Sequence, residues 1–460
     1  MTSHVNLAQQ VLERVRAEAG PGADAEVTIE DITLGLTRFA NSFIHQSVED
    51  TSALVRLRIH LDGRTASGST TVGDSAGLAA LVSRTVAAAR LCPPDPLWPG
   101  LAGPAPMTVG SEADPAIAAA TPADRAARVR AFVDAAGGLQ TAGYCSTMLW
   151  MLTFANSAGQ VAEASTADAV LDGIARDLGA DGSTRLSTRR LSELDGAVLG
   201  ARAAAKARAG VDPVELPPGR YEVVLEPTAV LDLVKNMGVF GFNGKAVHER
   251  RSFVELGQAQ LDPAITIVDD PVAADAAALP FDFEGTPRRR LTLVDRGVCV
   301  ALPHDRRSAA RAGTTSTGHA VPGGAVWGPF APNMALLASA NGASRPAEVD
   351  GPAADAAVAD LVASVGRGLL VTDNWYTRVL DPRTLVLTGL TRNGVWLIEN
   401  GEVTRPVQNL RFTQSYPQAL APGAVLGVGS HAVPVPFGWG SMRAPALRLA
   451  SWNFTGNASG

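Results

Sequence analysis

The chain has 460 residues, of which 46% are hydrophobic and 18% charged, and this composition excludes an intrinsically disordered protein and leaves room for two or three domains. Its formal net charge of −6 excludes the strongly basic surface that is typical of nucleic-acid-binding proteins. Its three cysteines are too few for a disulfide framework or a cysteine-rich metal site.

The first twenty residues contain no charged segment followed by an apolar run, so the sequence predicts no signal peptide. An apolar run of about 18 residues, which a membrane-spanning helix needs, is not found along the chain. Together with the low cysteine content, this pattern predicts a cytoplasmic protein without a membrane span.

The N-terminal half mixes helical and strand patterns. Residues 5–18 carry apolar side chains at helical spacing, and the segment AEVTIE that follows predicts a strand. The clearest alternation of apolar and polar side chains covers residues 55–61 and ends at Asp62-Gly63, a dipeptide typical of a hairpin turn. Further helices are predicted at residues 75–91 and 192–209.

Two further signals mark local structure in this half. Thr121 and Pro122 have the residue types favoured at the N-cap and first position of a helix. The tetrapeptide Phe-Ala-Asn-Ser occurs twice, at residues 39–42 and 154–157. Because Asn and Ser favour turns, we expect both copies to lie where a strand ends.

The second half is richer in strand patterns. The proline-rich stretch 210–220 predicts a domain boundary, and Asp295-Arg296-Gly297, Asn393-Gly394 and Asn400-Gly401 predict turns between strands. The sequence therefore predicts an α+β fold, with a mixed α/β N-terminal domain at residues 1–210 and a β-rich C-terminal domain with an antiparallel meander at residues 218–460.

His248-Glu249 has the first two residues of the zinc-protease motif His-Glu-x-x-His, in which two histidines four residues apart face one zinc ion. Here the position four residues on is Ser252, and the next is Phe253. Glu255, seven residues from His248, lies about 10 Å along a helix and cannot share the ion. The spacing in residues 248–255 therefore favours a helix with a partly exposed polar face over a zinc-binding motif.

Six collinear segments of the chain resemble the TldD/PmbA family, also called the modulator-of-gyrase family. They span nearly the whole chain and read LTRFANSFIHQ, DFEGTPRRRLTLVDRGV, TSTGHA, GRGLLVTDNWYTRVLDPRTLVLTGLTRNGVWLIENGEV, NLRFTQS and PALRLASWNFTG. This family forms heterodimeric metalloproteases. The catalytic subunit, TldD, carries a His-Glu-x-x-x-His motif and a C-terminal Cys as metal ligands. Its partner, TldE or PmbA, shares the fold without that site, and the pair cleaves unfolded peptides in an enclosed cavity.

The chain departs from the catalytic pattern at two positions. The second motif histidine falls on Phe253, and no cysteine follows Cys299. The resemblance therefore implies a TldE-like subunit that holds neither catalytic residues nor a metal, with zinc on a TldD-like partner and an unfolded peptide as substrate. A homodimer remains open for the chain alone.

Two alternatives remain open beside this hypothesis. One is a self-sufficient metal-dependent peptidase in which His248, Glu249 and another histidine, such as His319 or His431, rebuild a site. The other is a non-enzymatic interaction or regulatory protein. Copurifying zinc would distinguish the self-sufficient peptidase from the TldE-like subunit, and a requirement for a partner subunit would distinguish the TldE-like subunit from the regulatory protein.

Two short segments are candidates for binding substrate or partner. In Thr317-Gly318-His319, the glycine permits close backbone approach, and the histidine can hydrogen-bond either a bound chain or local loop groups. Tyr376 and Arg378 follow a predicted strand and are expected at a cavity or interface. Because neighbouring side chains on a strand point to opposite faces, Trp375 is expected in the core. His431 is expected in a loop without a chemical task.

Overall fold

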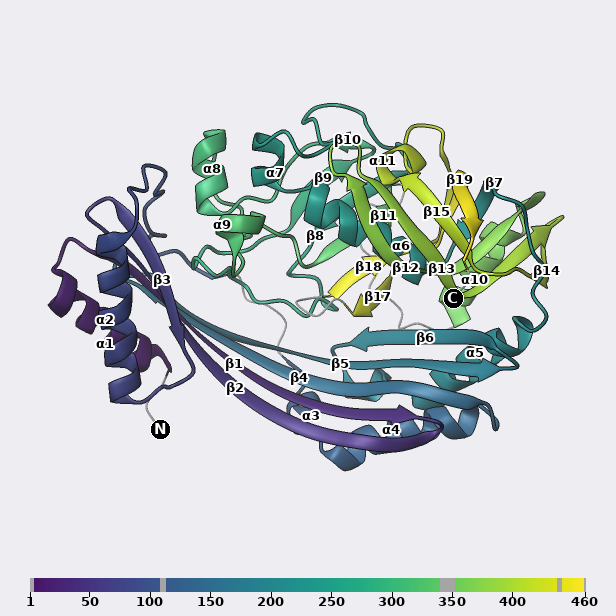
Figure 1. Cartoon of the computed structure of the whole chain (residues 1–460), viewed down its shortest axis with the longest axis horizontal. Helices are drawn as coiled ribbons and strands as arrows, with labels where there is room; N and C mark the ends of the chain where they lie inside the picture. Colours follow the sequence, from purple (N-terminus) through teal and green to yellow (C-terminus); the bar gives the residue numbers. More distant parts are fainter. Residues whose placement is uncertain (1–3, 108–112, 340–351, 437–440, 459–460) are drawn as a thin grey trace.

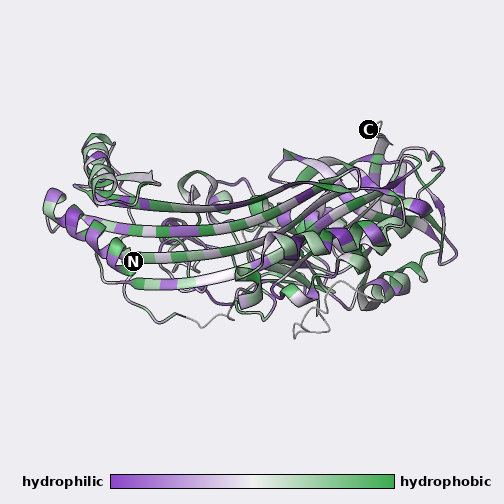
Figure 2. Cartoon of the chain, turned by 90° about the horizontal axis from the view of Figure 1, so that it is seen from below, coloured by the Kyte–Doolittle hydropathy of each residue, from purple (hydrophilic) through white to green (hydrophobic). Residues whose placement is uncertain are grey.

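The computed structural model describes residues 4–107, 113–339, 352–436 and 441–458. The long curved strands of an N-terminal sheet run along one side of the molecule, and the C-terminal strands and helices lie over the concave face of this sheet (Figure 1). Hydrophilic and hydrophobic residues alternate along these strands (Figure 2), as expected for a sheet whose two faces differ in environment. Among the described residues, no helix is both long and apolar enough to cross a membrane.

The N-terminal sheet has six strands in the order β3-β2-β1-β4-β5-β6, and every pair is antiparallel. Two successive units build it, each with a helix, three strands and a second helix. The first unit consists of α1 (His4–Ala19), β1 (Asp24–Ala40), β2 (Phe43–Leu61), β3 (Arg64–Thr70) and α2 (Ser75–Leu91). The second consists of α4 (Pro122–Ala135), β4 (Gln140–Asn156), β5 (Val161–Asp177), β6 (Ala180–Thr188) and α5 (Gly196–Ala209). The short element α3 (Pro115–Ala118) precedes α4, and η1 (Leu191–Glu193) precedes α5.

Because β1 pairs with β4 at the centre, the two units are arranged about the middle of the sheet, each with its own core. The first core packs α1 and α2 on residues such as Val27 and Leu57, and the second packs α4 and α5 on residues such as Phe39 and Leu171. The repeated tetrapeptide is part of this arrangement. Residues 39–42 end β1 and form its turn, and residues 154–157 end β4, as the sequence predicts.

The C-terminal half contains two further sheets. One has the order β10-β9-β8-β11-β18-β17. The other has the order β12-β7-β19-β15-β13-β14, and an additional pairing of β12 with β13 closes five of its strands into a ring. The strands are β7 (Gly219–Leu225), β8 (Ile265–Asp269), β9 (Leu291–Asp295), β10 (Val298–Cys299), β11 (Met334–Ala338), β12 (Arg367–Asp381), β13 (Val386–Glu399), β14 (Glu402–Pro406), β15 (Leu410–Ser415), β16 (Val425–Val428), β17 (Val433–Pro436), β18 (Ser441–Ala444) and β19 (Leu447–Asn457).

A single large hydrophobic core joins these two sheets, and buried residues such as Val223, Phe412 and Trp452 belong to it. The central helix α6 (Pro227–Asn236) contributes Val230, Leu233 and Val234 to the same core. The remaining helices are η2 (Met237–Gly241), α7 (Gly244–His248), α8 (Arg306–Ala312), α9 (Gly324–Trp327), α10 (Pro352–Val362) and α11 (Tyr416–Ala419). The predicted α+β class, with a β-rich C-terminal half, is confirmed. The predicted division into residues 1–210 and 218–460 stays a prediction.

Three of the predicted turns are confirmed. Asp62-Gly63, Arg296-Gly297 and Asn400-Gly401 all have positive φ values and join antiparallel strands. The prediction for Asn393-Gly394 is wrong, because both residues lie inside β13. Their φ values of 60° and 132° accompany a register shift against β12. Asn-Gly supplies the same positive φ to a β-bulge as to a hairpin turn, so the local sequence does not distinguish them.

The predicted helices are also present. α1 and α2 match residues 5–18 and 75–91, and α5 matches the later part of residues 192–209. Thr121 caps α4, and its side chain and that of Asp124 each accept a hydrogen bond from the other residue's backbone. This reciprocal arrangement satisfies two backbone donors that the first turn of a helix leaves without partners.

Candidate functional site

A cavity of about 780 Å³ opens between the outer strands of the N-terminal sheet and the C-terminal segment 283–325. Its wall on the sheet side includes residues 65–69 of β3, Glu26 and Thr28 of β1, and residues 56–58 of β2. The opposite wall includes Phe283, residues 320–325 and side chains from α7 and α8. Its volume lies in the usual range for ligand-binding sites, about 300–1,000 Å³.

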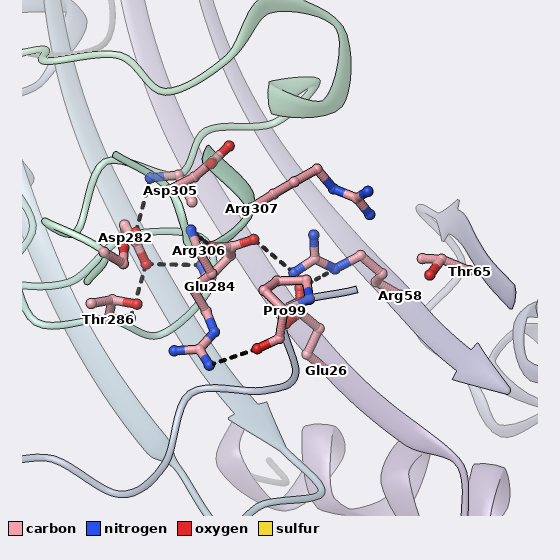
Figure 3. A network of polar contacts seen from close by, with 12 residues as sticks. Glu26, Arg58, Thr65, Pro99, Asp282, Glu284, Thr286, Asp305, Arg306 and Arg307 are labelled. Carbon is pink, nitrogen blue, oxygen red and sulfur yellow. Dashed lines mark hydrogen bonds and ion pairs between the residues drawn. The ribbon is translucent and has the colours of Figure 1, made fainter. Parts of the chain in front are cut away.

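A buried group of charged side chains forms one wall of this cavity (Figure 3). Glu26 on β1 and Arg58 on β2 are directly opposite each other in the sheet, and the Arg58 guanidinium lies 2.7 Å from the Glu26 carboxylate. The same guanidinium donates to Glu284 over 2.9 Å. Arg58 therefore joins the N-terminal sheet to the C-terminal half through two carboxylates that are nearly inaccessible to solvent.

Asp282 extends this group into the C-terminal segment. Its carboxylate accepts hydrogen bonds from the backbone N–H groups of Glu284, Thr286 and Ala320, at 2.9 Å each. The chain turns sharply here because Gly285 adopts a φ of 71°, with Phe154 packed where a side chain would otherwise project. The turn thus holds Glu284 toward Arg58.

Two of these carboxyl groups have strongly perturbed pKa values. Burial raises the pKa of Glu26 from 4.5 to about 7, because Arg58 offsets only part of the desolvation and Glu284 adds negative charge. Burial, followed by the charge of Glu284, raises the pKa of Asp282 from 3.8 to about 7. One oxygen of Glu26 is buried and has no hydrogen-bond partner among the residues that the structure describes. Perturbed carboxyl groups in a cavity are typical of functional sites.

Arginines of α8 attach the proline-rich loop to the same region. Arg307 donates to both oxygens of Asp95, at 2.8 and 2.6 Å, and this bidentate pairing holds the pKa of Asp95 well below its usual range. Arg306 donates to the carbonyl oxygens of Pro99 and Gly100. The loop is thereby fixed beside the cavity.

The concave face of the sheet continues from this cavity as a partly apolar surface. Residues opposite each other in an antiparallel sheet share a face, so Leu34 and Ile32 on β1 lie beside Met148 and Trp150 on β4. All four side chains are half-buried. Half-buried apolar side chains next to a charged cavity can contact the side chains of an extended peptide.

His248-Glu249 does not fit a zinc site. Helix α7 ends at His248, and Arg250 adopts a left-handed φ of 56°, so the helical face that a His-Glu motif requires is not continued. Glu249 lies 3.2 Å from Lys245 and 2.5 Å from Arg251, and hydrogen bonding to Arg251 holds its pKa below the usual value. The described residues contain no group of three His, Cys, Asp or Glu side chains arranged to hold a metal ion.

Phe253 occupies the position of the second motif histidine and belongs to the C-terminal core. Its ring is nearly inaccessible to solvent and packs edge-on against Phe242, with 5.8 Å between ring centres. Gly241 makes room for it, because a side chain at that position would come within 2.3 Å of the Phe253 ring. A histidine at this position would be enclosed by apolar groups.

Thr317, Gly318 and His319 lie together around buried Asp269. The Thr317 hydroxyl is 2.8 Å from His319 Nδ1, and His319 Nε2 is 3.0 Å from Asp269. Burial would raise the pKa of Asp269, but Arg288 and His319 lower it to about 2. Gly318 adopts a φ of 77° close to the backbone of Pro287. Here the histidine hydrogen-bonds groups of the protein itself, one of the two alternatives that the sequence leaves open.

Tyr376 and Arg378 lie on the surface of β12. Tyr376 is 64% exposed with a φ of 53°, and the Arg378 guanidinium lies 4.1 Å from the centre of its ring. The expectation that Trp375 belongs to the core is wrong, because its side chain is 46% exposed and Arg392 stacks on it. The β12–β13 register shifts between Trp375 and Arg378, and this bulge ends the alternation on which the expectation depended.

The sequence-predicted residues therefore form two separate groups. Thr317, Gly318 and His319 share one buried network, Tyr376 and Arg378 share one surface contact, and no interaction between the two groups is found in the part of the chain that the structure describes. His431 lies between β16 and β17, as predicted, beside the Ser430 hydroxyl. A role of the two groups, Thr317-Gly318-His319 and Tyr376 with Arg378, in binding substrate or partner stays a prediction.

Sequence reasoning missed Glu26, Arg58, Asp282 and Glu284. A signal was present for the C-terminal pair, because Asp282 and Glu284 lie in DFEGTPRRRLTLVDRGV, one of the segments that resemble the family. The pairing of Glu26 with Arg58 follows once the β1–β2 register is known.

Residues 218–456 match the sequence model of the PmbA/TldA metallopeptidase C-terminal domain, which covers more than half of the chain. The chain belongs to the TldD/PmbA family. Its fold is similar to that of TldE from Thermococcus kodakarensis, with a TM-score of 0.84 and 17% sequence identity over 98% of this chain and 100% of that one. It is also similar to TM0727 of Thermotoga maritima, a proposed DNA gyrase modulator, with a TM-score of 0.80 and 18% identity over 97% of this chain and 100% of that one.

At these identities the two structures show a shared fold. A curated relative in this comparison is the uncharacterized protein MJ0231 of Methanocaldococcus jannaschii, which is 34% identical over 101 residues. The match covers 21% of this chain and 24% of the relative, so the chain spans about a quarter of the relative's length. In this chain, the charged group around Arg58 ties the N-terminal sheet to the C-terminal segment that matches the family model.

Proposed function

We propose that this chain is a TldE-like subunit of a peptidase complex in which a TldD-like partner holds the catalytic zinc. Membership of the TldD/PmbA family supports this role. The observation that carries the proposal is Phe253, which fills the second histidine position with a ring packed in the core. A zinc site needs at least three protein ligands, and His248 with Glu249 supplies two at most.

The substrate in this proposal is an unfolded peptide that lies along the N-terminal sheet. Strand β3 is the outer strand of the sheet, and its residues 65–69 line the 780 Å³ cavity. An extended peptide beside such a strand is held through its main-chain groups, so many sequences are accepted. The half-buried apolar surface that includes Leu34 and Met148 supplies contacts for side chains.

The two subunits divide the work in this scheme. The partner's zinc supplies the hydrolytic chemistry, and this chain binds and orients the peptide and completes the chamber that excludes bulk water. Holding the peptide in one geometry lowers the entropic part of the barrier without any reacting group on this chain. No proton transfer or nucleophilic step is assigned to its residues.

Reconstitution tests the proposal. The chain, a TldD-like chain with an intact His-Glu-x-x-x-His motif, and their mixture are examined by light scattering and assayed on an unfolded peptide. We expect a heterodimer and peptidase activity only in the mixture. Hydrolysis by the isolated chain would support a self-sufficient peptidase instead, and a complex without activity would support a regulatory protein.

A further inference from the structure

The outer edge of β2 is largely open. β2 pairs with β1 along its whole length, but β3 pairs only with Val55–Leu61. Across the described ranges, residues 43–54 have no strand on their other side. Most of these residues are exposed to solvent. Their outward backbone N–H and C=O groups are therefore available to another strand.

This edge has little of the protection that open edges usually carry. The register shifts opposite Arg38 and Phe39, so that His45 is an extra residue and forms a bulge. Beyond the bulge, residues 46–54 are regular and contain neither proline nor lysine. Proteins commonly block long edges with such residues or cover them with other elements.

The opposite edge of the sheet is in contact with the C-terminal half. β6 contacts β17 and β13, and Arg185 on β6 lies 3.2 Å from Asp373 on β12. An added strand can therefore extend the sheet at β2.

Two acids define the chemistry of this edge. Asp50 lies on the face of the sheet that carries Leu34, is exposed, and forms no ion pair with any residue that the structure describes. Glu49 lies on the other face, where its carboxylate is 3.6 Å from the buried guanidinium of Arg125 on α4 and remains 55% exposed. Arg125 fits there because Gly35 has no side chain. A strand that pairs here meets the exposed carboxylate of Asp50 on one face and, on the other, the carboxylate of Glu49, which is already paired with Arg125.

We propose that residues 46–54 of β2 form the docking edge for an antiparallel strand of the TldD-like partner, and that this strand carries Lys or Arg opposite Asp50. This inference rests on the proposed function. A second copy of the chain fits less well, because full two-fold pairing of residues 46–54 places Asp50 opposite Asp50. Like charges directly opposite each other destabilise a strand pair, whereas opposite charges stabilise it.

Pairing at this edge has consequences for both subunits. A strand pair of this length adds on the order of ten main-chain hydrogen bonds and continues the sheet from one subunit into the other. The face that carries Leu34 and Met148 would then extend across the interface. A peptide bound along that face could contact both subunits.

Hydrogen–deuterium exchange tests the proposal directly. Deuterium uptake of residues 46–54 is compared in the free chain and in the complex with the TldD-like chain. We expect the outward-pointing amides, which alternate along the strand, to exchange at least tenfold more slowly in the complex. Unchanged exchange in an assembled, active complex would overturn this inference and leave the proposed function intact. Failure of any complex to form would overturn both.

A matched pair of charge reversals tests the chemistry of the partner strand. Asp50→Lys should weaken the complex at least tenfold in Kd, because a favourable charge pair becomes a repulsive one. Glu13→Lys makes the same change at an exposed position of α1 and should alter Kd less than twofold. Equal effects of the two variants would overturn the assignment of a basic partner strand. Slowed exchange of residues 46–54 in a homodimer of the chain alone would assign the edge to a second copy.

Discussion

Arg58 on β2 lies 2.9 Å from Glu284 of the C-terminal half, and this ion pair joins segments more than two hundred residues apart in the chain. The contact is largely shielded from solvent, and Arg58 also pairs with Glu26 on the neighbouring strand. One guanidinium thus neutralises carboxylates from both halves of the protein beside the proposed peptide cavity. Without the Arg58 guanidinium, the buried carboxylates of Glu26 and Glu284 repel each other, so one must bind a proton or the two must move apart.

We therefore expect Arg58→Met to lower the free energy of unfolding by about 3 kcal/mol at neutral pH, as for other buried ion pairs that lose one partner. Arg56→Met is the matched control on the same strand. Arg56 pairs with Glu30 at 3.0 Å and is more exposed, so its loss should cost about 1 kcal/mol or less. Urea unfolding measures both, and equal losses would contradict the role of Arg58.

Stability should also depend on the protonation of Glu26. Its pKa is raised from 4.5 to about 7 in the folded protein, so the folded state binds the proton more tightly than the unfolded state. Protonated Glu26 therefore adds to the free energy of unfolding, on the order of 3 kcal/mol. This added stability is complete below about pH 4.5 and is lost as the pH rises through about 7. Arg58, Glu284 and Arg306 are the charged groups that act on Glu26.

Glu26→Gln removes this titration, so unfolding free energies measured between about pH 5 and 8 should fall less steeply in the variant than in the native chain. The pKa of Asp282 is also raised to about 7, so part of the dependence of unfolding free energy on pH should remain in Glu26→Gln. Glu30→Gln, on the same strand, is the control. An unchanged slope in Glu26→Gln would show that the buried carboxyl is ionised throughout this range.

Features that depend on a few adjacent residues could be predicted from the sequence, and features that depend on strand register or on distant segments could not. Asp62-Gly63 and the cap at Thr121 depend on a few adjacent residues, and both are as predicted. The bulge at Asn393 and the exposure of Trp375 depend on how β12 and β13 are aligned. The group around Arg58 requires the β1–β2 register and the approach of a segment far along the chain, which neither spacing nor periodicity supplies.

The purified chain alone should hold no stoichiometric zinc. The reason is the donor set, in which Phe253 replaces a histidine and Glu249 is paired with Lys245 and Arg251. Elemental analysis after dialysis measures this directly. One tightly held zinc ion per chain, lost in His248→Ala, would contradict the prediction and favour the self-sufficient peptidase.

In the reconstituted complex, His248→Ala and Glu249→Ala should leave the peptidase rate within about tenfold of the native complex, since a true general base typically contributes 10²-fold or more. The matched control is an alanine at the motif Glu of the TldD-like partner, which should abolish activity. A drop beyond about 10²-fold in either variant of this chain would give the dipeptide a catalytic role.

The two groups of predicted binding residues should respond differently to truncation. His319→Ala removes a buried partner of Asp269 and should lower the free energy of unfolding by about 2 kcal/mol. Tyr376→Ala and Arg378→Ala change exposed side chains and should alter the free energy of unfolding by about 0.5 kcal/mol or less.

If Tyr376 and Arg378 bind the peptide, each of these two variants should weaken the binding of the peptide to the complex about tenfold or more, because exposed aromatic and arginine side chains often dominate interface energies. Fluorescence anisotropy with a labelled unfolded peptide measures this, and native affinity in both variants would remove Tyr376 and Arg378 from the proposed site.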